Sequence, residues 1–283
     1  MERTAYVNGA FVAERDATVS IFDRGFLFAD GVYEVVALVD GHFVDLAGHL
    51  DRLARSAHEI RLDVPIARPA LEAMLAELAS RNGVAEGLVY LQVTRGPAER
   101  DFAFPAAPRP TVVAYARTMR LVDHPLAAAG ATAVLVPDLR WARRDIKSVA
   151  LLPQVLAKQA ARAAGAFEAI MVHDGHVTEG GSANTYLVRD GTIVTFPLGH
   201  EILPGITRER VLGFARAEGL AIGERPFTTQ ELLAADELFV TSATTFVLPI
   251  VAVDGITIGT GAPGPVTQRL RARYVDWARA SGR

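Results

Sequence analysis

The sequence predicts a mixed α/β protein of two domains: a smaller α+β domain over residues 1–120 and a larger, β-rich, barrel-like α/β domain over residues 121–283. Half of the residues are hydrophobic and only 22% are charged, which is typical of a well-buried globular protein. Short β-rich runs alternate with apolar stripes at helical spacing. Residues 121–125, Leu-Val-Asp-His-Pro, fit a linker between the two domains.

Turn residues and apolar spacing predict the elements of the first domain. Asn8-Gly9 and Asp40-Gly41 are turn pairs that end short β runs. Leucines at 46, 50 and 53 recur at helical spacing. The expected order is a hairpin over 5–12, a strand over 32–39, helices over 46–60 and 69–80, and strands over 88–94 and 111–116 around a loop at 95–110.

The second domain is expected to be richer in strands. Pro153 suits the first turn of a helix over 149–164, which Gly165 ends. The remaining elements are a strand over 132–136, β units with Asp-Gly turns at 174–175 and 190–191, helices over 207–218 and 229–235, and a strand over 237–241.

Composition excludes several classes of function. The net charge of −3 gives no basic footprint for nucleic acid. No apolar run reaches the roughly 18 residues that a membrane span needs, and the N-terminus carries no apolar signal region. Cysteine is absent and the seven histidines form no HxxxH pair, so no metal site is expected. The absence of cysteine is also compatible with the cytoplasm, so a cytoplasmic protein that binds neither nucleic acid nor membrane is expected.

Lysine is rare in this chain. Lys147 and Lys158 stand against 27 arginines. Arginine stays charged in proteins, whereas a buried lysine can lose its proton and form a Schiff base with a carbonyl such as that of pyridoxal phosphate. Lys147, in Asp145-Ile146-Lys147-Ser148, is therefore the candidate for such a bond. The alternative is a lysine that merely survived compositional drift toward arginine.

Pyridoxal phosphate also needs a carboxylate at its pyridine nitrogen and donors for its phosphate. Glu179 opens a loop of small residues that would let a flat ring approach, although it could be an ordinary turn glutamate. Gly205-Ile206-Thr207 precedes a helix whose free N–H groups suit an anion, although Thr207 could simply be an N-cap.

Two further segments offer phosphate donors. The hydroxyl-rich turn over 241–245 could supply them, or could be a solvated loop. Arg52 lies among apolar residues on the first long helix, and a buried arginine requires an anion. A salt bridge from Arg52 to Asp51 or Glu59 is the alternative.

Together these segments resemble the class IV aminotransferases, the fold-type IV pyridoxal-phosphate enzymes, and above all their D-amino-acid aminotransferases. The resemblance runs in order from about residue 5 to residue 255. Its motifs lie at 23–36, 49–53, 145–148, 156–159, 178–180 with Asn184, 205–208 and 239–242.

The resemblance implies a role for each matching residue. Lys147 would carry the cofactor as an internal aldimine and shuttle a proton, and Glu179 would hold the pyridine nitrogen. Tyr33 and Arg100 would bind the substrate carboxylate. The phosphate would be bound by Arg52, Ile206, Thr207, Ser242, Ala243 and Thr244. In the family the loop with this arginine comes from the neighbouring subunit, so the resemblance implies a homodimer, with the cofactor at the domain interface.

The sequence departs from the family pattern at a few positions. D-specific members usually carry a histidine two residues after the carboxylate arginine, where this chain has Phe102. Gly181, Ala183 and Ala243 stand where hydroxyl residues are frequent. Phe102 bears on the substrate range, whereas Ala243 can still donate its backbone N–H.

The leading interpretation is transamination of D-amino acids, such as D-alanine, with 2-oxo acids, such as 2-oxoglutarate or pyruvate. An (R)-selective amine transaminase is the first alternative, and Phe102 leans toward it. An aminodeoxychorismate lyase and a branched-chain aminotransferase follow, the latter disfavoured by the D-type segments around Tyr33 and Arg100. A non-catalytic binding protein of the same fold remains, against which the presence of both Lys147 and Glu179 argues.

Overall fold

The computed structural model describes residues 2–281, which form two compact units. The first unit contains the chain up to Met119 together with Ile146–Ala150 and Ser281, and the second contains Arg120–Asp145 and Leu151–Ala280. The expected boundary near residue 120 is close to this division. The expected domains differ from the units mainly at Ile146–Ala150, which carries Lys147 and belongs to the first unit, and at Ser281, which does so too.

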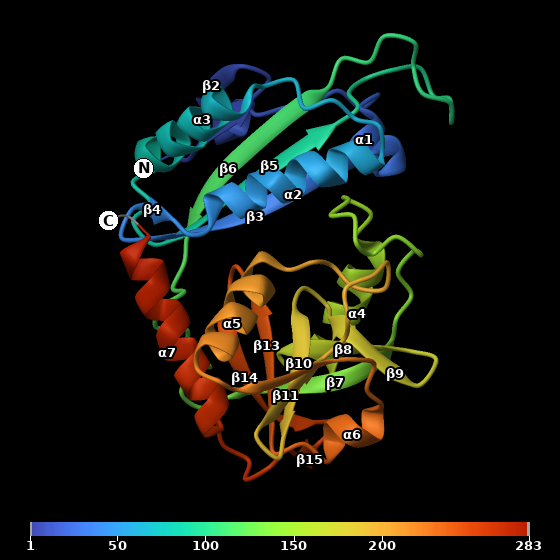
Figure 1. Cartoon of the computed structure of the whole chain (residues 1–283). Helices are drawn as coiled ribbons and strands as arrows, with labels where there is room; N and C mark the ends of the chain where they lie inside the picture. The colour runs from blue at the N-terminus through green and yellow to red at the C-terminus, as the bar shows by residue number, and fades with distance from the viewer. Residues whose placement is uncertain (1, 282–283) are drawn as a thin grey trace. The chain divides into compact units, whose positions relative to one another are not determined.

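The first unit is built on an antiparallel sheet of six strands in the order β2-β1-β6-β5-β3-β4, with helices α2 and α3 packed on it (Figure 1). The elements are β1 (Thr4–Val7), β2 (Ala10–Ala13), a 3₁₀ turn (Glu14–Asp16), α1 (Arg24–Phe28), β3 (Gly31–Val39), β4 (His42–Phe43), α2 (Leu46–Glu59), α3 (Arg68–Arg81), β5 (Gly87–Thr94) and β6 (Thr111–Thr118). The expected hairpin forms because Asn8 and Gly9 both adopt positive φ, as a two-residue hairpin turn requires. Leucines of α2 and α3 pack on β5 and form the core of this unit.

The segment Ile146–Ala150 joins the first unit by strand-like pairing. Ser148 pairs with Val32 across an antiparallel bridge. Tyr33 N donates to Lys147 O at 3.0 Å, and Val149 N donates to Gly31 O at 3.0 Å. The predicted helix over 149–164 was therefore wrong at its start: α4 spans Leu152–Ala163, because Val149 donates its N–H to β3 instead.

The second unit is built on a nine-stranded mixed sheet in the order β12-β11-β10-β13-β14-β7-β8-β9, with β15 paired to β14 (Figure 1). Its strands are β7 (Ala131–Pro137), β8 (Glu168–His173), β9 (His176–Gly180), β10 (Asn184–Arg189), β11 (Thr192–Thr195), β12 (Ala221–Glu224), β13 (Glu237–Ser242), β14 (Phe246–Val253) and β15 (Ile256–Thr257). Gly180 N donates to Ala183 O, so β9, at one end of this order, turns directly into β10 and the sheet curls. This is the barrel-like arrangement expected from the sequence.

Most helices of the second unit were expected from the sequence. Besides α4, α5 (Ile206–Ala217) and α6 (Thr229–Leu233) begin within one residue of the predicted positions. α7 (Pro265–Ala280) was missed, as was the short α1 in the first unit. Among residues 2–281, no helix combines the length and apolar character that crossing a membrane requires. Within the same residues, no group of three or more His, Asp or Glu side chains is arranged to hold a metal ion.

Candidate active site

Lys147 and Tyr33 lie together in the first unit. Lys147 Nζ is 4.3 Å from the centroid of the Tyr33 ring, and that ring stacks on Tyr90 with 5.6 Å between centroids. The backbone of Lys147 is fixed on both sides, because its carbonyl accepts from Tyr33 N at 3.0 Å and its N–H donates to Ser56 Oγ at 3.2 Å. The predicted cofactor lysine and one predicted substrate residue are thus held against each other by strand pairing.

Arg52 is buried and paired with Glu34, the residue after Tyr33 on β3. Its Nε donates to Glu34 Oε1 at 2.7 Å, and its Nη2 donates to Oε2 at 2.8 Å. His49 Nδ1 lies 2.7 Å from the same Oε2. The alternative pairing of Arg52 with Asp51 was wrong, because Asp51 pairs with Arg68 on the surface.

The sequence analysis missed Glu34 and His49. A usable signal was present, because His49 and Arg52 are three residues apart and therefore lie on one face of a helix. Burial would raise the pKa of Glu34, but Arg52 and the hydrogen bond from His49 lower it to about 2. Glu34 is therefore a fully buried carboxylate that stays charged at neutral pH and balances the guanidinium of Arg52.

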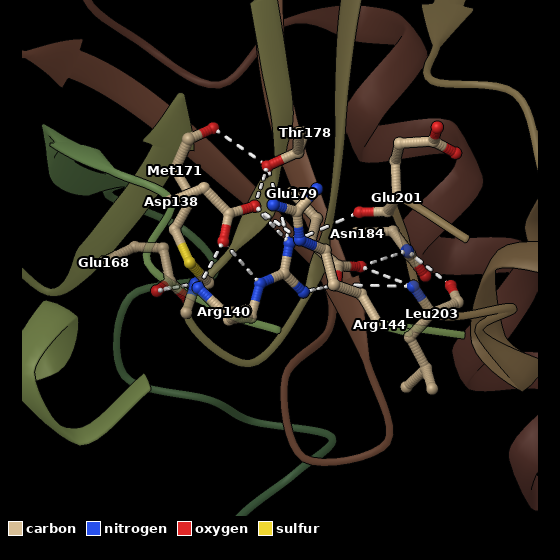
Figure 2. A network of polar contacts seen from close by, with 11 residues as sticks. Asp138, Arg140, Arg144, Glu168, Met171, Thr178, Glu179, Asn184, Glu201 and Leu203 are labelled. Carbon is tan, nitrogen blue, oxygen red and sulfur yellow. Dashed lines mark hydrogen bonds and ion pairs between the residues drawn. The ribbon is translucent and has the colours of Figure 1, made fainter. Parts of the chain in front are cut away.

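Glu179 lies near the end of β9 in the second unit and is buried in a network of polar contacts (Figure 2). Arg140 Nη1 donates to its Oε1 and Asn184 Nδ2 donates to its Oε2 at 2.9 Å. Leu203 N donates to both oxygens, at 3.3 and 3.2 Å. These donors fix the orientation of the Glu179 carboxylate, and a carboxylate is the acceptor that a protonated pyridine nitrogen requires.

Arg140 is held from its other side by Asp138. Its Nε and Nη2 lie 2.9 and 2.6 Å from the two Asp138 oxygens. Thr178 Oγ1 donates to Asp138 Oδ2 at 2.7 Å, and Arg144 Nε lies 3.4 Å from the same oxygen. Arg140 and Asp138 were missed by the sequence analysis, because nothing in the local pattern of residues 138–140 points to Glu179.

The charges of this network oppose the effect of burial on the pKa of Arg140 and on that of Glu179. Burial alone would lower the pKa of Arg140, but Glu179 and Asp138 raise it above the ordinary value for arginine. Burial raises the pKa of Glu179, and Arg140 with the N–H of Leu203 opposes that rise. Because the pKa of Glu179 stays above its ordinary value, the donors around it offset only part of the cost of keeping a carboxylate charged in the protein interior.

Asn184 connects Glu179 to the start of α5. Its Nδ2 donates to Leu203 O at 2.9 Å as well as to Glu179. A Cβ atom on Gly205 would lie 2.0 Å from Asn184 Oδ1, so only glycine allows this approach. Gly205 is the N-cap of α5, and as a glycine it offers no side chain that could accept from the first N–H groups of the helix. These N–H groups also have no acceptor within the helix. The N–H groups of Ile206 and Thr207 therefore suit an anion.

The alternative in which Thr207 is the N-cap was wrong. Thr207 is the second residue of α5, and its hydroxyl lies 3.5 Å from Tyr274 Oη. The turn after β13 adjoins this region, because Asn184 is opposite Thr241 in the β10–β13 ladder. In that turn Ser242 Oγ accepts from Thr244 N at 3.3 Å and lies 2.8 Å from Thr245 Oγ1. The structure thus gathers Glu179, residues 205–207 and the turn containing Ser242, Ala243 and Thr244.

Arg100 lies in the first unit, in the exposed loop between β5 and β6. Its guanidinium carbon is 5.4 Å from the ring centroid of Phe28 and 5.7 Å from that of Phe102. Tyr33 has different partners, Tyr90 and Lys147. Tyr33 and Arg100, the two residues predicted to bind the substrate carboxylate, therefore contact different aromatic rings.

Comparison with known proteins places this arrangement in a family. Residues 31–253 match the family described as Amino-transferase class IV. The chain belongs to the class IV aminotransferases. Proteins named D-alanine aminotransferase are 43% identical over 264 residues in Bacillus licheniformis, covering 93% of each chain, and 39% identical over 272 residues in Staphylococcus haemolyticus, covering 95% of each chain.

Solved structures named branched-chain amino acid aminotransferases share the fold over nearly the whole chain. A branched-chain amino acid aminotransferase from Escherichia coli superposes with a TM-score of 0.92 at 25% identity, covering 98% of this chain and 94% of that chain. A branched-chain aminotransferase from Thermoproteus uzoniensis, solved with norvaline, gives 0.87 at 29% identity, covering 99% and 96%. The fold-type IV architecture expected from the sequence is confirmed. Members of this family use pyridoxal 5′-phosphate, and the donors around Glu179 and at the start of α5 fit that cofactor.

Replacement of Glu34 by glutamine should change the acid stability of the protein. The pKa of Glu34 is lowered from 4.5 to about 2, so its contribution is present above pH 4.5 and is lost as the pH falls through 2. At about 1.4 kcal/mol for each pH unit, that contribution is about 3 kcal/mol. Glu34→Gln should therefore lower the free energy of unfolding at pH 7 by about 3 to 5 kcal/mol, because Arg52 is left buried without a counter-charge.

Urea unfolding measured between pH 7 and pH 2.5 tests this prediction. The difference between parent and variant should shrink as the pH falls. Glu77→Gln is the matched control, because Glu77 forms an exposed ion pair with Arg81. This substitution should change the free energy of unfolding by less than about 1 kcal/mol. A difference between parent and Glu34→Gln that stays constant with pH would contradict the role given to the Glu34 charge.

Proposed function

We propose that this class IV aminotransferase transfers the amino group between D-amino acids, such as D-alanine, and 2-oxo acids, such as pyruvate or 2-oxoglutarate. The relatives named D-alanine aminotransferase support this substrate class, because they are 39% and 43% identical and span nearly the whole chain. The branched-chain aminotransferases among the solved structures are less similar, at 25% and 29%.

The contacts of Asn184 are the observation that carries the cofactor-binding part of this proposal. Its side chain contacts both the predicted pyridine carboxylate, Glu179, and the backbone just before the predicted phosphate cradle, at Leu203. One cofactor needs these two anchors at a fixed separation, and one asparagine holds both. We propose that Ile206, Thr207 and the turn residues Ser242, Ala243 and Thr244 bind the phosphate, the alanine through its N–H. We further propose that Arg52, with its charge balanced by Glu34, contributes a phosphate contact.

Bound pyridoxal phosphate supplies an electron-accepting ring that stabilises negative charge at the amino acid Cα. The residues of the chain then have distinct tasks. Lys147 Nζ is proposed to hold the cofactor and to move the Cα proton. Glu179 is proposed to keep the pyridine nitrogen protonated, since a neighbouring carboxylate favours the charged form of that nitrogen.

Tyr33 and Arg100 are proposed to bind the substrate carboxylate. A planar guanidinium can hold a carboxylate through two parallel hydrogen bonds. An (R)-selective amine transaminase remains the second candidate, because the rings nearest to the Arg100 guanidinium are those of Phe28 and Phe102. Two phenyl rings around the substrate-binding group would also accept an apolar amine.

We also propose that the protein is a homodimer that forms through the first unit. Large apolar side chains are exposed there, including Ile21 at 69%, Phe26 at 73% and Phe102 at 78%. Large apolar side chains exposed in this way suit a contact between two copies of the chain. The cytoplasmic location expected from the sequence stays a prediction, which fractionation of cells producing the protein would check.

Lys147→Arg should abolish transamination, because arginine cannot form the bond to the cofactor. Borohydride reduction of the holoenzyme followed by peptide mapping should place the pyridoxyl group on Lys147. Lys158→Arg is the matched control, because Lys158 is the other lysine and pairs with Glu168 at 2.6 Å. Labelling of Lys158, with Lys147→Arg still active, would refute the assignment.

Glu179→Gln should leave the cofactor bound but slow transamination by about 10²-fold, comparable to the loss of other single electrostatic contacts in active sites. The single-turnover rate with D-alanine measures this effect, and the cofactor absorbance reports occupancy. Glu201→Gln, at an exposed position nearby, should have the parent rate. An unchanged single-turnover rate in Glu179→Gln would remove this carboxylate from the mechanism.

Arg100→Ala should lower kcat/KM for D-amino acids by about 10- to 150-fold, because it removes a hydrogen-bonded partner of the substrate carboxylate. Activity on an (R)-arylalkylamine, which has no carboxylate, should be spared. Light scattering should give twice the chain mass of 30.3 kDa for parent and variant alike. Equal losses on both substrates, or a variant that is monomeric, would show that Arg100 supports the fold or the dimer instead.

A further inference from the structure

Arg24 is a buried arginine that the proposed chemistry does not use. It is the first residue of α1, which Asp23 caps by accepting from Gly25 N at 2.8 Å. Only 3% of Arg24 is exposed, although residues 99–104 of the neighbouring loop are exposed. A guanidinium buried beneath an exposed loop requires an explanation, because its hydrogen bonds must all be satisfied by protein.

The Arg24 guanidinium holds three consecutive carbonyl groups of that loop. Its Nη1 donates to Asp101 O at 2.5 Å and to Ala103 O at 3.2 Å. Its Nη2 donates to Phe102 O at 3.3 Å. Residues 101–103 form no strand or helix, so this side chain supplies hydrogen bonds that regular structure does not.

Asp30 fixes Arg24 and a second arginine at once. Its Oδ2 accepts from Arg24 Nε at 2.8 Å and from Arg95 Nε at 2.8 Å. Arg95 in turn lies 3.7 Å from the ring centroid of Phe104, the next residue of the loop. Burial raises the pKa of Asp30, but hydrogen bonds from Arg95 and Arg24 outweigh it, so the pKa is lowered overall. One charged carboxylate thus orients two guanidinium groups that hold residues 101–104.

On the other side of Arg100 the loop is also tied to α1 and to Phe22, which lies just before the α1 cap. Arg24 N donates to Gly96 O at 3.0 Å, and Ala98 N donates to Phe22 O at 3.2 Å. Arg100 lies between these ties and the three carbonyl groups. Its guanidinium carbon is 5.4 Å from the ring centroid of Phe28, which also belongs to α1. The position of Arg100 is therefore set from both ends by α1 and its first side chain.

We propose that Arg24 is a positioning residue for substrate selection: it fixes residues 101–103 so that Arg100 presents its guanidinium to the substrate carboxylate. This inference rests on the proposed function, which gives Arg100 that task. Lysine could not replace Arg24, because a single ammonium cannot reach Asp30 and three carbonyl oxygens in the geometry of a planar fork.

The test uses Arg24→Lys in the pyridoxal-phosphate-loaded enzyme. Single-turnover kinetics across a range of D-alanine concentrations should show the apparent Kd raised about 10-fold, with the limiting rate within about 3-fold of the parent, because binding geometry and not chemistry is disturbed. Hydrogen exchange should rise in residues 97–105 and stay unchanged in β3. Arg81→Lys, an exposed arginine of the same unit paired with Glu77, should match the parent in both measurements.

A double variant distinguishes positioning from general support of the fold. If Arg24 acts through Arg100, Arg24→Lys should weaken D-alanine binding no further in an Arg100→Ala background. An additional loss of about 10-fold in that background would overturn the proposal. If Arg24→Lys does not fold, Asp30→Asn serves instead, since its amide oxygen still accepts from Arg24 while the charge is removed, and it should shift Kd and exchange in the same direction.

The failure of this inference is distinguishable from the failure of the proposed function. If Arg100→Ala weakens D-alanine binding while Arg24→Lys leaves Kd and loop exchange unchanged, the inference alone is overturned. If Arg100→Ala leaves D-alanine binding unchanged, the role of Arg100 in the proposed function fails, and positioning for substrate selection fails with it.

Discussion

The pairing of buried carboxylates with guanidinium groups is the constraint on which the candidate site depends. Glu179 lies in the interior, where an isolated charge would be expelled or neutralised. Arg140 balances it, Asp138 balances Arg140, and Arg144 contacts Asp138 in turn. Each charge is tolerated because of the next one, so the loss of one member leaves the others uncompensated.

The same principle accounts for the unusual ratio of arginine to lysine. Three buried arginines each donate to both oxygens of one carboxylate: Arg52 to Glu34, Arg140 to Asp138 and Arg95 to Asp30. A planar guanidinium makes two parallel bonds to a carboxylate, which an ammonium cannot do. In a protein that buries several of these pairs, arginine is therefore the appropriate cation.

Much of the fold could be predicted from short-range signals. Asn8-Gly9 and Asp40-Gly41 mark turns by themselves, and the leucines of α2 mark its buried face. The candidate site residues Lys147, Glu179 and Thr207 could be predicted from their neighbours in sequence and from family resemblance. The site residues that were missed depend on distant partners: Arg140 and Glu179 are 39 positions apart, and Glu34 and Arg52 are 18 apart. The spacing of His49 and Arg52 indicates a shared helix face, but no local pattern names their distant partner or pairs Arg140 with Glu179.

The start of α4 illustrates the same limit. The sequence of residues 149–151 favours a helix, but the N–H of Val149 donates to the carbonyl of Gly31, more than a hundred residues earlier. Intrinsic helix propensity is a weak preference that a strand pairing of this kind readily overrides. The boundaries of elements are therefore less predictable than their existence wherever a segment docks on a remote strand.

The docking of Ile146–Ala150 on β3 has a consequence for how this architecture can be recombined. The polypeptide leaves the second unit for five residues and then returns to it, so the two compact units are not two continuous stretches of sequence. A chimera made with a single crossover near residue 120 would join Lys147 from one parent to a β3 strand from the other. Exchange of modules between relatives is therefore expected to require a second, internal crossover that keeps this short segment with its own sheet.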